Sequence, residues 1–124
     1  MTNNDQNTNL AELKKLCQQF SDQRNWEQYH NPKDLAMALS IEGGELSELF
    51  LWQDNEQIAQ RLNQDAEFRQ QVADELADVL IYCLQMAIRV DFDITSIIAA
   101  KMGKNALKYP VEKAKDSAKK YDEL

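Results

Sequence analysis

The chain has 124 residues, of which 44% are hydrophobic, and this size fits one small domain with its own core. The formal net charge is −7, so a basic surface for nucleic acid is not expected, although metal ions can bridge an acidic protein to a phosphorylated small molecule. Only three glycines and two prolines occur, which favours long helices joined by few turns.

The chain also lacks the sequence features of membrane and secreted proteins. Its polar start, residues 1–8, has no apolar signal-peptide core, and we expect it to be a disordered tail. The longest apolar run is interrupted by Asp78 and Gln85 and is shorter than the roughly 20 residues that span a bilayer. Cys17 and Cys83 form no Cys-x-x-Cys motif and are expected to be buried thiols. We predict a cytoplasmic protein that does not bind membranes.

Apolar residues that recur at spacings of three and four predict helices along most of the chain. The expected helices run from about 10 to 25, 33 to 52, 65 to 90 and 94 to 107, with a short helix or loop at 54–62. Asn31 and Pro32 suit the N-cap and first position of the second helix, and Asp93 suits the N-cap of the fourth.

These elements predict an all-α fold, an antiparallel bundle of four main helices. The helical domain should cover 9–110, followed by a charged, weakly helical tail at 111–124. Two of the long helices are apolar on most of their faces, which one small domain cannot bury alone. We therefore expect a homo-oligomer.

Two pairs of acids stand inside the most apolar stretches of the chain. Glu42 and Glu45 are three residues apart, as are Glu75 and Asp78, so each pair lies on one face of its helix. Four inward carboxylates without a cation would repel one another, and burying them would cost a great deal of free energy. A divalent cation with oxygen ligands removes this cost.

The ligand types narrow the choice of metal. A set made only of carboxylates favours Mg²⁺, with Mn²⁺ possible, over zinc or iron, and the single histidine, His30, lies outside both pairs. Because Mg²⁺ usually recruits substrate phosphates, this site suggests hydrolysis of a phosphate ester or phosphoanhydride. Glu48, one turn beyond Glu45, can be a fifth ligand, a base that activates water, or an exposed acid.

Two further groups of residues admit both a functional and a structural interpretation. Lys101 and Asn105 share a helix face and can contact a phosphate and a base, or can simply be solvated, and Tyr109 can staple the end of that helix. Aromatic rings near the acids can stack on a nucleobase or belong to the core. These rings are Trp26, His30, Trp52 and Tyr82.

The paired acids, Glu42–Glu45 and Glu75–Asp78, resemble the EXXE and EXXD signature of the MazG-like, all-α nucleoside triphosphate pyrophosphohydrolases. Three other segments resemble the single-domain dCTP pyrophosphatase branch of that family. They are Arg24–Pro32, Leu49–Trp52 and Lys101–Pro110. The resemblance covers roughly residues 10–110 and implies a MazG-like helical bundle.

The resemblance also implies roles for individual residues. Mg²⁺ would be held by Glu42, Glu45, Glu75 and Asp78. Phosphates would be contacted by Lys101 and Tyr109. The nucleoside would be bound by Trp26, His30, Trp52, Tyr82 and Asn105. The assembly would be a tetramer built as a dimer of dimers. Cys17 stands where related enzymes can carry a polar pocket residue, and it bears on base selectivity.

The resulting hypothesis is Mg²⁺-dependent hydrolysis of a deoxynucleoside triphosphate, dCTP or a related nucleotide, to the monophosphate and pyrophosphate. Glu45 or Glu48 would act on the attacking water and Lys101 on the leaving pyrophosphate. The biological use would be clearing surplus or damaged nucleotides. The alternatives are a dUTP or phosphoribosyl-ATP pyrophosphohydrolase of the same superfamily, or a non-catalytic helical interaction protein.

Overall fold

The computed structural model describes residues 2–124, which form helices and turns without a strand. Two compact units are formed, one ending at Asp91 and one covering Phe92–Leu124. The helices of the first unit are α1 (Leu10–Gln23), a short 3-10 helix (Glu27–Tyr29), α2 (Pro32–Glu48), α3 (Asn55–Gln64) and α4 (Ala66–Arg89). The second unit contains α5 (Ile94–Lys108), α6 (Val111–Ala114) and a 3-10 turn (Tyr121–Glu123). The all-α prediction is confirmed.

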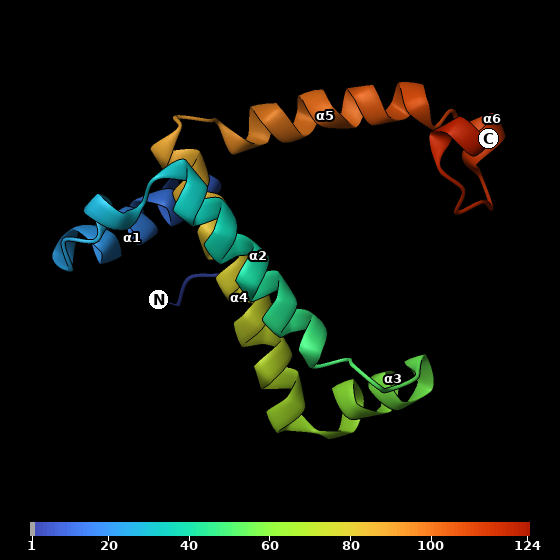
Figure 1. Cartoon of the computed structure of the whole chain (residues 1–124), viewed down its shortest axis with the longest axis horizontal. Coiled ribbons are helices and arrows are strands. Elements are labelled where there is room, and N and C mark those ends of the chain that lie inside the picture. The colour runs from blue at the N-terminus through green and yellow to red at the C-terminus, as the bar shows by residue number, and fades with distance from the viewer. Residues whose placement is uncertain (1) are drawn as a thin grey trace. The chain divides into compact units, whose positions relative to one another are not determined.

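The centre of the first unit is an antiparallel pair of long helices. Helices α2 and α4 lie side by side, and the chain passes from one to the other through α3 (Figure 1). Helix α3 packs against α4 near its start, and α1 also packs against α4. Helix α4 therefore contacts each of the other three α-helices of this unit.

Short polar side chains begin the long helices where the sequence predicts them. The Asn31 side chain accepts a hydrogen bond from the backbone N–H of Asp34 at 2.9 Å, and Pro32 follows as the first helical residue. The Asp93 carboxylate accepts from the backbone N–H of Ser96 at 2.9 Å. Both predicted N-caps are confirmed.

Helix α2 ends earlier than the sequence analysis expects. It stops at Glu48 and not near Trp52, and a series of turns follows. Trp52 has a backbone φ of 64°, in the left-handed region that a helix cannot use. The sequence could not indicate this helix end, because the apolar residues that follow Glu48 include no glycine or proline.

The buried core of the first unit is small and centred on α4. Phe68 and Leu35 are each 1% exposed, and Leu84 is 8% exposed. The Phe68 ring packs edge-on against Phe50 with centroids 6.0 Å apart, while the Arg61 guanidinium lies 3.8 Å from the ring centroid. Phe68 thus joins α4 to α3 and to the turn after α2.

The two cysteines differ in burial. Cys17 is buried and its thiol pKa is raised by that burial, whereas Cys83 is exposed. The expectation that both would be buried is wrong for Cys83, because Leu84 and Gln85 take the buried positions at that turn of α4. Both thiols are free.

In the second unit, the tail returns to the end of α5. The Tyr109 and Tyr121 rings meet edge-on with centroids 6.2 Å apart, and the Lys108 ammonium lies 4.8 Å from the Tyr121 centroid. The helical content predicted for the tail is limited to four residues in α6 and the 3-10 turn. Across residues 2–124, none of the helices has the length and apolarity required to cross a membrane.

Replacing Phe68 by alanine should destabilise the protein by about 3–5 kcal/mol, because a fully buried ring leaves a cavity between α3 and α4. Phe68→Leu is the matched control and should lose much less, since it retains most of the apolar volume. The free energy of unfolding by urea measures both. A loss below about 1 kcal/mol for Phe68→Ala would contradict this description of the core.

Candidate functional site

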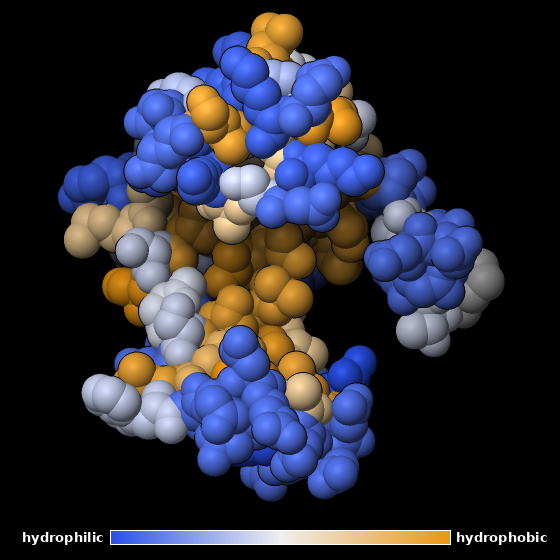
Figure 2. Space-filling view, turned by 90° about the vertical axis from the view of Figure 1, so that its right-hand side faces the viewer, coloured by the Kyte–Doolittle hydropathy of each residue, from blue (hydrophilic) through white to orange (hydrophobic). Residues whose placement is uncertain are grey.

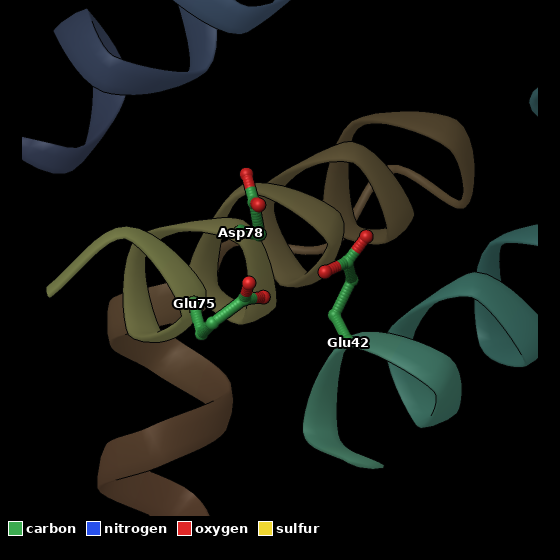
Figure 3. A group of neighbouring side chains, drawn as sticks. All are labelled: Glu42, Glu75 and Asp78. Atoms are coloured by element: carbon green, nitrogen blue, oxygen red, sulfur yellow. The ribbon is translucent and has the colours of Figure 1, made fainter. Parts of the chain in front are cut away.

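The acid pairs predicted from the sequence meet across the α2–α4 pair. Glu42 on α2, and Glu75 and Asp78 on α4, each offer one carboxylate oxygen, and these three atoms all lie within 4.8 Å of one another. Figure 3 shows the side chains of Glu42 and Glu75 reaching toward each other from the two helices, with Asp78 one turn along α4. We call these three residues the carboxylate cluster.

The electrostatics of the carboxylate cluster are those of crowded anions. Desolvation, followed by the neighbouring carboxylates Glu45, Asp78 and Glu75, raises the pKa of Glu42 to about 7. Desolvation and Glu45 also raise the pKa of Glu75. Without a cation, Glu42 therefore stays partly protonated near pH 7, where an isolated carboxylate would be ionised.

Two carboxylate oxygens of the cluster lack hydrogen-bond partners among the described residues. Among the described residues, Glu42 and Glu75 each have a buried Oε2 atom without a hydrogen-bond partner. A buried carboxylate oxygen in this state is costly unless a cation or a proton meets it. The residues present therefore fit a divalent metal, because they bring hard oxygen donors, excess negative charge and unpartnered carboxylate oxygens to one point.

The other two acids predicted for the site lie near its edge. Glu45 raises the pKa of both Glu42 and Glu75, although it is exposed and is not one of the three converging residues. Glu48 is exposed at the last position of α2. Their proposed roles as ligand or base remain predictions.

A cavity of about 220 Å³, the aromatic cavity, adjoins the start of α2. Its walls include Trp26, Tyr29 and His30 from the segment before α2, and Tyr82 from α4. Tyr82 is one helical turn beyond Asp78, which relates this cavity to the carboxylate cluster along one helix. Three of the aromatic residues predicted to bind a nucleoside, Trp26, His30 and Tyr82, thus line one space.

A second cavity, of about 250 Å³, lies between α1 and the end of α4, and we call it the polar cavity. It is lined by Gln18, Ser21, Glu27, His30, Gln85, Ile88 and Arg89. His30 belongs to both cavities. The Arg89 guanidinium pairs with the Glu27 carboxylate at 3.1 Å in the wall of the polar cavity.

The remaining predicted site residues lie elsewhere. Trp52 is 92% exposed in the turn after α2 and lines neither cavity. Lys101, Asn105 and Tyr109 belong to the second unit, where Lys101 and Asn105 share a face of α5 and Tyr109 follows the helix end. Their contacts with substrate remain predictions.

Sequence analysis did not assign Gln85, Ser21, Glu27 or Arg89 to the site. The signal for Gln85 was present, because it interrupts an apolar run seven residues after Asp78 and so returns to the same face of α4. No spacing rule links Glu27 to Arg89, since their pairing depends on how the segment after α1 approaches α4.

Comparisons with known proteins identify the family of the chain. The MazG-like family model matches residues 37–124. Rat and human dCTP pyrophosphatase 1 are 38% and 37% identical to the chain over 115 residues, covering 93% of the chain and 67% of each relative. A crystal structure of a pyrophosphatase from Archaeoglobus fulgidus superposes with a TM-score of 0.76 at 34% identity, covering 88% of this chain and 99% of the other.

The chain therefore belongs to the MazG-like family, in the branch that contains the dCTP pyrophosphatases. It is an enzyme of the nucleoside triphosphate pyrophosphohydrolase class.

Ionisation of Glu42 should oppose folding when metal is absent, because its pKa of about 7 in the folded protein exceeds the ordinary value of 4.5. The contribution of protonated Glu42 to the free energy of unfolding is complete below pH 4.5 and is lost as the pH rises through about 7. In a chelator, the free energy of unfolding should fall across this range, and Glu42→Gln should reduce the fall. Urea titrations at several pH values measure the difference.

The matched control is Glu48→Gln, which removes an exposed acid from the same helix. Its pH dependence should follow that of the unmodified protein. An identical pH dependence for Glu42→Gln and the unmodified protein would show that Glu42 is not held among repelling carboxylates.

Proposed function

We propose that the enzyme hydrolyses a deoxynucleoside triphosphate, dCTP or a close analogue, to the monophosphate and pyrophosphate, and so removes surplus or damaged nucleotides. The observation that carries this proposal is the carboxylate cluster with its two buried, unpartnered oxygens. The names of the relatives support the choice of dCTP.

The carboxylate cluster would hold the metal, with Glu45 completing the set. Mg²⁺ is the preferred ion and Mn²⁺ the alternative, since both take oxygen ligands. When bound, such an ion neutralises charge on substrate phosphates and lowers the pKa of water. The protein supplies the positions of the three converging carboxylates on two packed helices, α2 and α4.

The reaction requires a water oxygen to bond to the α-phosphorus while the bond from that phosphorus to the bridging oxygen breaks. One proton of the water must leave, and an exposed carboxylate beside the cluster, Glu45 or Glu48, would accept it. The leaving pyrophosphate carries the bridging oxygen and its electron pair. Lys101 and Tyr109 would contact its phosphates and stabilise this charge.

The nucleoside would enter the aromatic cavity. Trp26 and Tyr82 offer faces for stacking, and His30 offers ring nitrogens for hydrogen bonds. Asn105 and Trp52 would contribute further contacts. The location of Tyr82 one turn from Asp78 supports this assignment, because a nucleotide places its base a short distance from its α-phosphate.

We also propose that the enzyme is a homo-oligomer, a tetramer built as a dimer of dimers. Large apolar side chains are exposed on both central helices of the first unit: Met37 and Ile41 on α2, and Leu76, Leu80 and Ile81 on α4. Figure 2 shows apolar side chains gathered between hydrophilic regions of the visible face. A patch of this kind on a small protein usually marks an interface.

Mg²⁺ should raise the melting temperature of the protein by mass action, because it binds only the assembled carboxylate cluster. Glu75→Gln should abolish this increase. Asp74→Asn is the matched control, since Asp74 is exposed and accepts a hydrogen bond from Gln70 on its own helix at 2.8 Å. Thermal unfolding with and without Mg²⁺ measures the effect, and an equal increase in both variants would remove Glu75 from the metal site.

Pyrophosphate release from dCTP, dTTP, dUTP, dATP and dGTP should be Mg²⁺-dependent and fastest with dCTP. Glu75→Gln should reduce kcat by at least about 100-fold with its helical content retained, because a cluster ligand is lost. Asp74→Asn should retain activity. Fastest release from dUTP would favour the dUTP-type alternative, and release that is unaffected by Glu75→Gln would contradict the proposed site.

A further inference from the structure

The polar face of α4 extends well beyond the carboxylate cluster. Glu75, Asp78, Tyr82, Gln85 and Arg89 recur at spacings of three and four, so they form one stripe along the helix. Gln85 is seven residues beyond Asp78, a rise of about 10 Å along the axis at roughly 1.5 Å per residue. It therefore lies on the metal-binding face at the distance where a nucleotide held by its phosphates presents its base.

Gln85 is a buried amide in a fixed orientation. It is 6% exposed, and its Nε2 donates to the Cys17 carbonyl oxygen at 3.1 Å and to the Ser21 hydroxyl oxygen at 2.9 Å. A carbonyl oxygen can only accept, so the atom facing Cys17 must be the amide nitrogen. The Oε1 atom must then point away from α1.

The free end of this amide faces the polar cavity. Gln85 lines the cavity, and its Oε1 atom accepts no hydrogen bond from residues 2–124. The cavity volume of about 250 Å³ is below the roughly 300–1,000 Å³ typical of drug-sized ligands, which suits one edge of a ring better than a whole nucleotide. Through His30 it adjoins the aromatic cavity.

We propose that Gln85 is the specificity-determining residue for the base: its Oε1 atom accepts a hydrogen bond from the exocyclic amino group of a 4-aminopyrimidine. The inference rests on the proposed function, because it assumes that the aromatic cavity holds the nucleoside. Cytosine presents an amino donor at the position where uracil and thymine present a carbonyl acceptor. The wrong base would place two acceptors face to face in a buried site, which is strongly unfavourable.

Ser21 acts as a positioning residue in this arrangement. It is 1% exposed, and its hydroxyl holds the amide that would read the base. Cys17 contributes through its backbone carbonyl and not through its thiol. Base selection at this position of α1 thus requires no polar side chain at residue 17.

The test measures nucleotide binding and not turnover, so that it does not depend on the catalytic step. Calorimetric titration with dCMP and dUMP should give a preference for dCMP of about tenfold or more in the unmodified protein. Gln85→Met, which keeps the volume and removes the acceptor, should bring the two dissociation constants together. Ser21→Ala should reduce the preference in part, because the Gln85 amide loses its hydrogen bond to the Ser21 hydroxyl. Gln70→Met, an exposed glutamine on the same helix, should leave the preference unchanged.

An unchanged preference for dCMP in a folded Gln85→Met protein would overturn the inference, as would equal binding of dCMP and dUMP to the unmodified protein. If Gln85→Met does not fold, an unchanged preference in Ser21→Ala has the same meaning. The proposed function fails separately, by absence of pyrophosphate release from a protein that still prefers dCMP.

Discussion

Repulsion between carboxylates that two packed helices hold together is the constraint on which the rest of this structure depends. Glu42 on α2 faces Glu75 and Asp78 on α4, and the pairing of these helices fixes the distances between the three groups. Relaxing the repulsion by separating the helices would expose more of a core that is already small. A cation is the compensation that leaves the helices in place, and it is also what phosphoanhydride hydrolysis requires. In the proposed function, stability and activity would therefore depend on the same atoms.

The same helix orders the site along its length. From the carboxylate cluster, the polar stripe of α4 continues to Tyr82 in the aromatic cavity and to Gln85 and Arg89 in the polar cavity. A nucleotide has its phosphates, sugar and base in the same sequence, so one helix can contact all three parts. Helix α1 and the segment before α2 complete the walls of the two cavities. In the proposed function, base selection and phosphate chemistry would both depend on α4, at positions separated by a few helical turns.

Helical periodicity explains how much of the site could be predicted. Spacings of three residues were sufficient to place Glu42 and Glu75 on the inward faces, and Asn31 and Asp93 could be recognised as N-caps because capping is a local interaction. Which acids converge depends on how α2 crosses α4, and no local sequence pattern specifies that crossing. The sequence therefore could not show that Glu42, Glu75 and Asp78 form the cluster while Glu45 lies outside it. The position of Trp52 was missed for a different reason: the chain enters a left-handed conformation there without a glycine to mark it. The orientation of the Gln85 amide depends on hydrogen bonds to α1, which lies more than 60 residues earlier in the chain, so no local pattern could predict it.

Anomalous scattering from crystals grown with Mn²⁺ and a non-hydrolysable dCTP analogue tests the central claim most directly, because it locates the metal independently of any variant. The account predicts a manganese peak bounded by the carboxylates of Glu42, Glu75 and Asp78, in contact with the substrate phosphates. Nucleotide bound with manganese only at other residues, and none among these three, would contradict it.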